Sequence, residues 1–460
     1  MNDSRIKLMA SAPIHKAVNK ISLPAISGLI IMALYNIVDT MFVAWIGTEA
    51  TGATQIVMPI IMLSSAIGLA LGMGAAAVVS RLLGKKERDA ASRICSTTFF
   101  LGIILGILFI IVNLIFMDRI LHFFGATEAV IELAESYAFY IILGSIFMIS
   151  NMVMNNLLRS EGSAMISMMG MGLGSILNII LDPLFIFTFQ WGISGAAIAT
   201  TISQGVTFVI LLSAYLRKKT VCSLKIKFIS LDKAYFKSIM TVGLPTFFKQ
   251  LLFSLSMAVM NQSSVHYGGA DLLAAIGVLT RITLLPTYII FGLGQGVQPV
   301  IGFNQGSGDI GRVRSAFFYA MKVSGVAMGA NALLFLTVPS YIMHIFRASP
   351  EVTAFGVTGL YAYSAALFLY GFSNTITVFF QALGKGVESM ILSTARQGFI
   401  LIPLLILMGR NYGALGVLLA QTFSDILTFI LSATFLFPLL KSGELNIELQ
   451  KQKGELLNAI

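Results

Sequence analysis

The chain has 460 residues, of which 57% are hydrophobic and 11% are charged. Soluble domains carry about 25% charged residues, so this composition excludes an ordinary soluble protein and indicates a chain that spans a membrane. The net charge of +10 would suit nucleic-acid binding, but most Lys and Arg lie in the tails and in alternate loops, as the positive-inside rule describes. We therefore expect the lipid bilayer and no nucleic acid as a partner, with both termini in the cytosol.

Long apolar stretches follow one another along the whole chain, and a spanning helix needs about 20 apolar residues. In chain order they predict twelve spans, at about 17–46, 53–80, 94–117, 131–157, 165–187, 195–216, 239–266, 273–303, 316–339, 352–380, 388–409 and 414–440. The first is too long for a signal-peptide core and no small-residue cleavage site follows it, so we keep it as a span. We expect an all-α integral membrane protein, multi-pass in the plasma membrane.

The sequence repeats itself once. Leu23-Pro24 recurs as Leu244-Pro245, and residues 192–196 recur in pattern at 413–417, both at an offset of 221 residues (244 − 23). This repeat predicts an N-terminal lobe of six spans at 1–216, a cytosolic linker at 217–238, a C-terminal lobe of six spans at 239–440 and a cytosolic tail at 441–460. Six spans per half give both halves the same orientation, so the two lobes are related by a pseudo-twofold axis along the membrane normal.

Two deep acids fall in the first half, Asp39 in span 1 and Asp182 in span 5. A charge at the middle of a membrane costs at least about 2.5–3.5 kcal/mol, so each acid calls for a functional explanation. Asn178 lies one helical turn before Asp182, on the same face. With a hydroxyl from Thr200 or Thr201, these groups form an all-oxygen pocket that suits a proton or Na⁺. Static hydrogen bonds between helices are the alternative.

Further polar residues are candidates for lining a substrate cavity. Tyr35 and Asn36 lie four and three residues before Asp39, so they share its helix face. Asn151 and Asn155 are one turn apart on span 4. Hydrogen bonding between helices remains open for the two asparagines of span 4.

Pro24 lies about one turn into span 1, and Asp39 follows about four turns later on the same helix. Proline removes a backbone donor and disturbs the preceding turn. We expect Pro24 to act as a hinge that lets a cation at Asp39 change the shape of span 1. A plain start signal for the helix is the alternative.

The second half carries a different set of charges. Lys249, Arg281, Arg396 and Asp425 all fall inside predicted spans, where they are a candidate polar cluster. Asp425 is expected to pair with Arg396 or Arg281, and the basic residues either stabilise the lobe or face a cavity.

The motifs of several enzyme classes are absent from the sequence. No Gly-x-x-x-x-Gly-Lys-Ser/Thr loop and no His-Glu-x-x-His occurs, so neither an ATPase nor a zinc protease is encoded. Two cysteines, Cys95 and Cys222, predict no disulfide framework. We expect no enzyme, no catalytic residue, no structural metal and no cofactor, and transport driven by an ion gradient.

Several segments together resemble the multidrug and toxic-compound extrusion (MATE) family, over about residues 17–440. They are Leu23-Pro24, the Asp39 segment, 74–84 at the end of span 2, 178–183, 192–200 and Arg396-Gln397-Gly398. The resemblance is to the DinF-like branch. It implies the MATE/MOP-type fold, a cation-coupling site at Asp39, Asn178, Asp182 and Thr200, and a bend of span 1 at Pro24. The acids that the NorM-like branch carries in spans 7 and 10 are missing.

The resemblance implies efflux of amphipathic or cationic drugs in exchange for H⁺ or Na⁺, by a monomer that alternates between two access states. A lipid-linked precursor flippase of the same superfamily is the nearest alternative, because such cavities are often rich in basic residues. A major-facilitator carrier and an intramembrane enzyme are further alternatives. The former usually carries a Gly-x-x-x-Asp-Arg-type loop after span 2, where this chain has Ser80-Arg81-Leu82-Leu83-Gly84-Lys85-Lys86.

Overall fold

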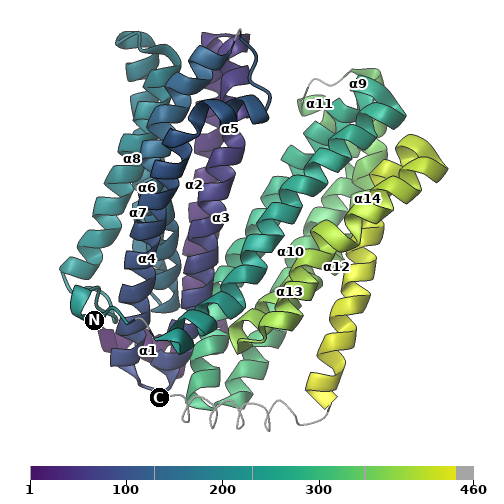
Figure 1. The fold of residues 1–460 in the computed structure, drawn as a ribbon. Helices are drawn as coiled ribbons and strands as arrows, with labels where there is room; N and C mark the ends of the chain where they lie inside the picture. Colours follow the sequence, from purple (N-terminus) through teal and green to yellow (C-terminus); the bar gives the residue numbers. More distant parts are fainter. Residues whose placement is uncertain (1, 129, 231, 347–348, 442–460) are drawn as a thin grey trace. The chain divides into compact units, whose positions relative to one another are not determined.

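A computed structural model describes residues 2–128, 130–230, 232–346 and 349–441, and these form helices and loops with no strand (Figure 1). The helices in chain order are α1 (Asn2–Ala10), α2 (Ile14–Ile46), α3 (Thr48–Gly84), α4 (Arg88–Ile115), α5 (Met117–Phe123), α6 (Ile131–Ser160), α7 (Ala164–Pro183), the π-helix η1 (Leu184–Thr188), α8 (Gly192–Leu216), the 3₁₀-helix η2 (Ile226–Phe228), α9 (Lys233–Ser307), α10 (Ile310–Thr337), α11 (Pro339–Ile345), α12 (Pro350–Leu383), α13 (Gly386–Thr394), the π-helix η3 (Ala395–Phe399) and α14 (Leu401–Lys441).

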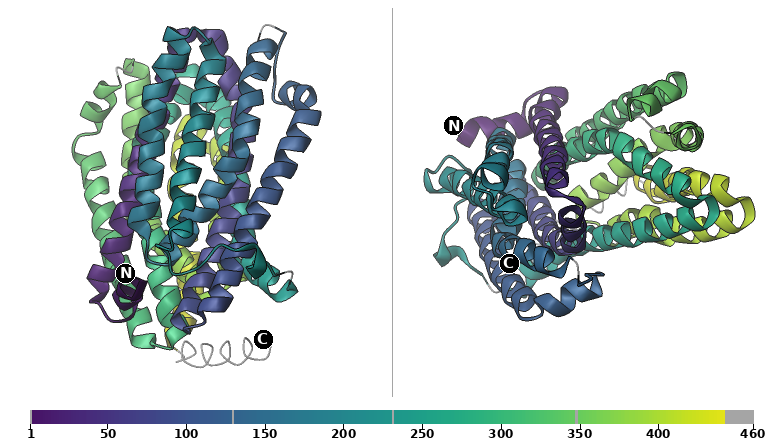
Figure 2. Two further views of the ribbon diagram at one scale, coloured as in Figure 1. Left: turned by 90° about the vertical axis from the view of Figure 1, so that its left-hand side faces the viewer. Right: turned by 90° about the horizontal axis from the view of Figure 1, so that it is seen from above.

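The chain divides into two compact units. Unit 1 comprises residues up to Ala12 and Lys20–Gly243, and unit 2 comprises Pro13–Asn19 and the residues from Leu244 onward. The segment 217–238 groups with unit 1, and 442–460 of the predicted tail lie outside the described residues. In unit 1, α6 packs on α3, α4 and α8, and these long helices run side by side (Figure 2). In unit 2, α12 packs on α10 and α14.

Ten helical stretches of the described chain are long and apolar enough to cross a membrane. Two of them are interrupted by a glycine with positive φ: Gly269 (φ 65°) inside α9 and Gly413 (φ 58°) inside α14. A helix cannot continue through this backbone conformation, so each of the two stretches holds two spans, and ten plus two gives twelve. The predicted all-α fold with twelve spans in two halves is therefore confirmed.

The repeated glycine motif has a structural cause in both units. Gly192 and Gly413 adopt positive φ (54° and 58°), which turns the chain between two consecutive helices. Three residues later, a Cβ on Gly195 would lie 2.7 Å from the carbonyl carbon of Phe185, and one on Gly416 would clash with the carbonyl oxygen of Met408. The motif thus combines a left-handed turn with close contact between two backbones.

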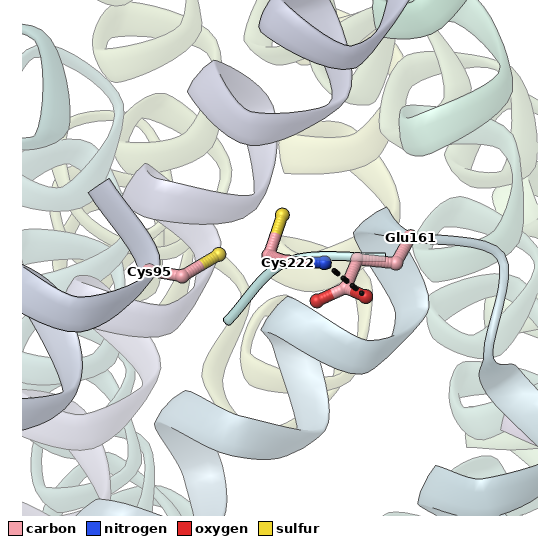
Figure 3. Close-up of side chains that lie close together, drawn as sticks. All are labelled: Cys95, Glu161 and Cys222. Atoms are coloured by element: carbon pink, nitrogen blue, oxygen red, sulfur yellow. Dashed lines mark hydrogen bonds between the residues drawn. The ribbon is translucent and has the colours of Figure 1, made fainter. Parts of the chain in front are cut away.

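Glu161, in the turn between α6 and α7, fastens the segment after α8 (Figure 3). Its Oε2 accepts hydrogen bonds from the backbone N–H groups of Val221 (2.6 Å) and Cys222 (3.2 Å), and its Oε1 accepts one from the Tyr215 hydroxyl (3.2 Å). Burial raises the pKa of Glu161 to about 7. The sulfurs of Cys95 and Cys222 lie within 4.8 Å of each other and of this carboxylate, and both thiols are free. Since both carboxylate oxygens already accept hydrogen bonds, we interpret this cluster as an anchor.

Candidate functional site

The centre of unit 1 holds a cluster built on α7 and α8. The amide of Asn178 donates to Oδ1 of Asp182 (3.1 Å) and, more weakly, to Oγ1 of Thr200 (3.4 Å). Asn178 and Asp182 are buried, at 2% and 0% exposure. Their spacing of four residues places both side chains on one face of α7. The neighbouring Thr201 donates to the carbonyl of Tyr140 (2.8 Å) instead, so Thr200 is the threonine that joins the cluster.

Local backbone irregularity follows directly after Asp182. Pro183 is the last residue of α7, and the chain continues as the π-helix η1. Proline has no N–H to donate to the preceding turn, and π segments inside helices occur frequently at functional sites. The sequence therefore places a break in the regular hydrogen-bond ladder beside the buried carboxylate.

Asp39 of α2 completes this cluster. Its half-buried carboxyl group lies close enough to Asp182 for the two acids to interact. Within the described chain, three buried oxygens of the cluster have no hydrogen-bond partner: Oδ1 of Asp39, Oδ1 of Asn178 and Oδ2 of Asp182. Buried acceptors without partners are rare and call for an explanation. Two carboxylates and an amide oxygen are ligands that a hard cation prefers, so the donor set fits Na⁺ as well as a proton.

A cavity lies beside the cluster, inside unit 1. Asn178 and Thr200 line it, and so do three of the four residues predicted to face a substrate cavity, Tyr35, Asn151 and Asn155. Asn36 does not line it, because its exposed side chain donates to the carbonyl of Met32 one turn back (2.9 Å).

The two asparagines of span 4 also join helices. Asn151 donates to the backbone and the side-chain oxygen of Gln204, both at 2.9 Å, and Asn155 accepts from Ser167 (2.8 Å). The sequence left two roles open for Asn151 and Asn155, lining a cavity and hydrogen bonding between helices. The structure shows both, because each residue lines the cavity and forms a hydrogen bond to a neighbouring helix.

Sequence reasoning missed the polar face of α8. Ser203, Gln204 and Thr207 line the cavity together with Thr200. Their spacing from Thr200 is three, four and seven residues, which is the pattern of one helix face. This periodicity is visible in the sequence and would have identified them.

Pro24 is buried in α2, and the helix runs through it from Ile14 to Ile46. Pro24 therefore lies in the interior of the helix that carries Asp39, and not at its first residue. Its lack of an N–H removes one bond from the ladder of α2.

In unit 2, the structure brings together part of the predicted charged cluster. Nε of Arg396 donates to Oδ1 of Asp425 (2.5 Å), its Nη2 lies 3.5 Å from Oδ2, and its guanidinium carbon lies 3.9 Å from the centre of the Tyr370 ring. Lys249 is near enough for its charge to repel that of Arg396. Arg281 is exposed on α9 and is not among the residues that line the adjacent cavity. Asp425 thus pairs with Arg396.

The family model named MatE matches the chain twice, at residues 24–184 and 245–407. The two matches begin 221 residues apart (245 − 24), which is the offset of the internal repeat.

Known proteins match this chain in sequence and in structure over nearly its whole length. The chain is 29% identical to the multidrug export protein MepA of Staphylococcus aureus (strain N315) over 91% of this chain and 92% of that protein. Among solved structures, a MATE in the straight conformation shares 27% identity at a TM-score of 0.90, covering 97% of this chain and 99% of that one. A MOP superfamily transporter from Pyrococcus furiosus, described as having a binding pocket of reverse polarity, shares 27% identity at a TM-score of 0.87, covering 94% and 96%. This chain belongs to the MATE family of transporters.

Proposed function

We propose that this chain is a secondary active transporter, and not an enzyme, that exports amphipathic or cationic compounds in exchange for H⁺ or Na⁺. The observation that carries the proposal is the cluster of Asp39, Asn178 and Asp182, whose partnerless oxygens lie beside a cavity that Asn178 itself lines. Relatives of similar length are multidrug export proteins, which supports compounds of this kind as substrates.

The acid cluster gives the exchange a physical basis. Two adjacent carboxylates repel each other when both are ionised, and a proton or Na⁺ held between them relieves the repulsion. A cationic compound in the neighbouring cavity gains from the same negative charge. Each ligand therefore weakens the other, and this coupling is reciprocal by thermodynamic necessity. Thr200 and Asn178 supply further oxygens for Na⁺.

We assign the switch between the two access states to a movement of α2. This helix carries both Pro24 and Asp39, so a cation that draws Asp39 toward Asp182 pulls on a helix that is weakened at its proline. Related MATE structures have been solved in a straight and in a bent conformation, which supports such a movement. In this proposal the protein is a plasma-membrane monomer of the DinF-like branch with both termini in the cytosol, and it needs no resident cofactor.

Transport in proteoliposomes tests the proposal, with pH and Na⁺ gradients imposed separately and ethidium as the exported cation. We expect one of the two gradients to drive transport by the wild-type protein. Asp182→Asn should lower the rate at least about tenfold, since a hydrogen-bonded charge contributes about 1.5–3 kcal/mol. Asp118→Asn, on the 71% exposed acid of α5, is the control and should transport normally. Full gradient-driven transport by Asp182→Asn would refute the coupling role.

A further inference from the structure

Unit 2 contains a cavity of its own. Three aromatic rings and two methionines line it, Phe253, Tyr363, Tyr370, Met257 and Met260, together with hydroxyl and amide side chains. Methionine adapts its shape to different partners, and aromatic rings offer flat apolar contact. Such a lining suits an aromatic, amphipathic molecule.

Two charged residues line this cavity in the described chain, Arg396 and Asp425. Arg396 belongs to the π-helix η3, and its backbone carbonyl accepts a hydrogen bond from Ser424 (2.8 Å). The guanidinium lies over Tyr370, while Asp425 takes Nε and Nη2 along one edge. A guanidinium has five N–H donors in a planar fork, and Asp425 uses two of them. The fork is therefore held in a fixed orientation with further donors available for a second acceptor.

The charges around the cavity are unequal. Asp425 balances one cation, while Arg396 and Lys249 are close enough to repel each other. The ammonium of Lys249 lies 5.7 Å from the centre of the Phe291 ring, which stabilises a cation only weakly. Arg396 and Lys249 together carry one positive charge more than Asp425 balances, and an anionic group would restore the balance.

We propose that this second cavity binds amphipathic aromatic compounds that carry a carboxylate, with Arg396 as the anchor of the carboxylate and Lys249 as the supporting charge. The guanidinium fork matches a carboxylate in two hydrogen bonds, and the ring of the ligand lies among Tyr363, Tyr370 and the methionines. The proposal does not depend on cation exchange in unit 1.

Calorimetry on the purified, detergent-solubilised full chain tests this with three probes of one shape: 2-naphthoate, 2-naphthylmethylammonium and 2-naphthalenemethanol. We expect the wild-type protein to bind 2-naphthoate at least about tenfold more tightly than the other two. The double variant Arg396→Gln/Asp425→Asn keeps a hydrogen-bonded pair without charge, and it should lose this preference. Lys249→Gln should weaken 2-naphthoate severalfold and leave the neutral probe unchanged.

Arg281→Gln is the matched control, because it removes the same charge from the same unit but from an exposed position. It should bind 2-naphthoate like the wild type. Thermal melting checks that each variant is folded, and Lys249→Gln, which leaves the ion pair intact, keeps the test valid if the double variant does not fold. Unchanged binding of 2-naphthoate by Lys249→Gln and by a folded double variant overturns the proposal. So does tighter, Arg396-dependent binding of dihexanoyl phosphatidylglycerol, which would assign the cavity to a lipid headgroup.

Discussion

The two units carry charged clusters of opposite sign. In unit 1, the carboxylates of Asp39 and Asp182 lie among neutral amides and hydroxyls. In unit 2, Asp425 is neutralised by Arg396, and Lys249 adds a further cation. The sequence repeat thus copies the backbone turns at Gly192 and Gly413 but not the polar side chains. Duplication preserved the scaffold of the six-helix unit while the chemistry of each copy diverged.

The π segments show the same divergence. Each follows a helix that begins at an equivalent position, Ala164 in α7 and Gly386 in α13, 222 residues apart. η1 comes after Asp182 and Pro183, whereas η3 begins at Ala395, much closer to the start of its helix. The irregular turn therefore supports a carboxylate in one unit and presents a guanidinium in the other. η1 follows the residues Asp182 and Pro183, whereas η3 itself carries Arg396.

Neutralising the charged cluster of each unit in turn tests most directly whether the two clusters have separate roles. Asp39→Asn removes a charge from the acidic cluster, and we expect ethidium export driven by the coupling gradient to fall at least about tenfold. Arg396→Gln/Asp425→Asn removes both charges of the other cavity and should leave ethidium export within about twofold of the wild type. Export measured in the same proteoliposomes gives both numbers. Equal losses in the two variants would show that the cavities do not act separately.

The turns after spans 4 and 10 differ in charge as well. Glu161 anchors the first, whereas the neutral amide of Gln305 donates to the carbonyl of Leu383 (3.1 Å) in the second. Burial raises the pKa of Glu161 from 4.5 to about 7, so the folded protein holds this proton more tightly than the unfolded chain does. The resulting penalty is complete above pH 7 and disappears as the pH falls toward 4.5.

We therefore expect Glu161→Gln to gain stability relative to the wild type as the pH rises from 5 to 8, by up to about 3 kcal/mol. Melting temperatures measured across this range give the difference. Glu132→Gln, on an exposed acid of the preceding helix α6, is the control and should follow the wild-type pH profile. A constant difference between Glu161→Gln and the wild type would show that Glu161 does not titrate in this interval.

The smallest expected effect concerns the part that the two units share. A Cβ on Gly416 would clash with the carbonyl oxygen of Met408, and one on Gly195 would lie 2.7 Å from Phe185. Both Gly→Ala variants should lower the melting temperature, Gly416→Ala more, by about 1–3 kcal/mol in free energy of unfolding. Gly277→Ala, in α9 with nothing within 4 Å of the added Cβ, should be neutral or slightly stabilising. If all three behave alike, close backbone contact does not explain the repeated motif.

The sequence predicted the helices and most of the acidic cluster because hydrophobic length and a spacing of four residues are local properties. The spacing of residues left open whether Thr200 or Thr201 supplies the hydroxyl of the cluster. Neighbouring residues on a helix point about 100° apart, and tertiary packing selects between them. Asn36 was placed in the cavity by its spacing from Asp39, but its amide bonds its own helix. Likewise, the sequence offered Arg396 and Arg281 as partners of Asp425, and the choice of Arg396, like the two π segments, depends on how the helices pack.

The close contact at Gly195 has a consequence for how a bound ion leaves. Because Gly195 brings the start of α8 against the backbone of η1, Asp182, Asn178 and Thr200 lie on one tightly packed helical hairpin, and we expect their mutual distances to change little during transport. Asp39 comes from outside that hairpin. We expect a bound ion to leave when Asp39 moves away from the other three ligands, which stay in place. The movement that couples ion release to transport would then be a displacement of Asp39 on α2.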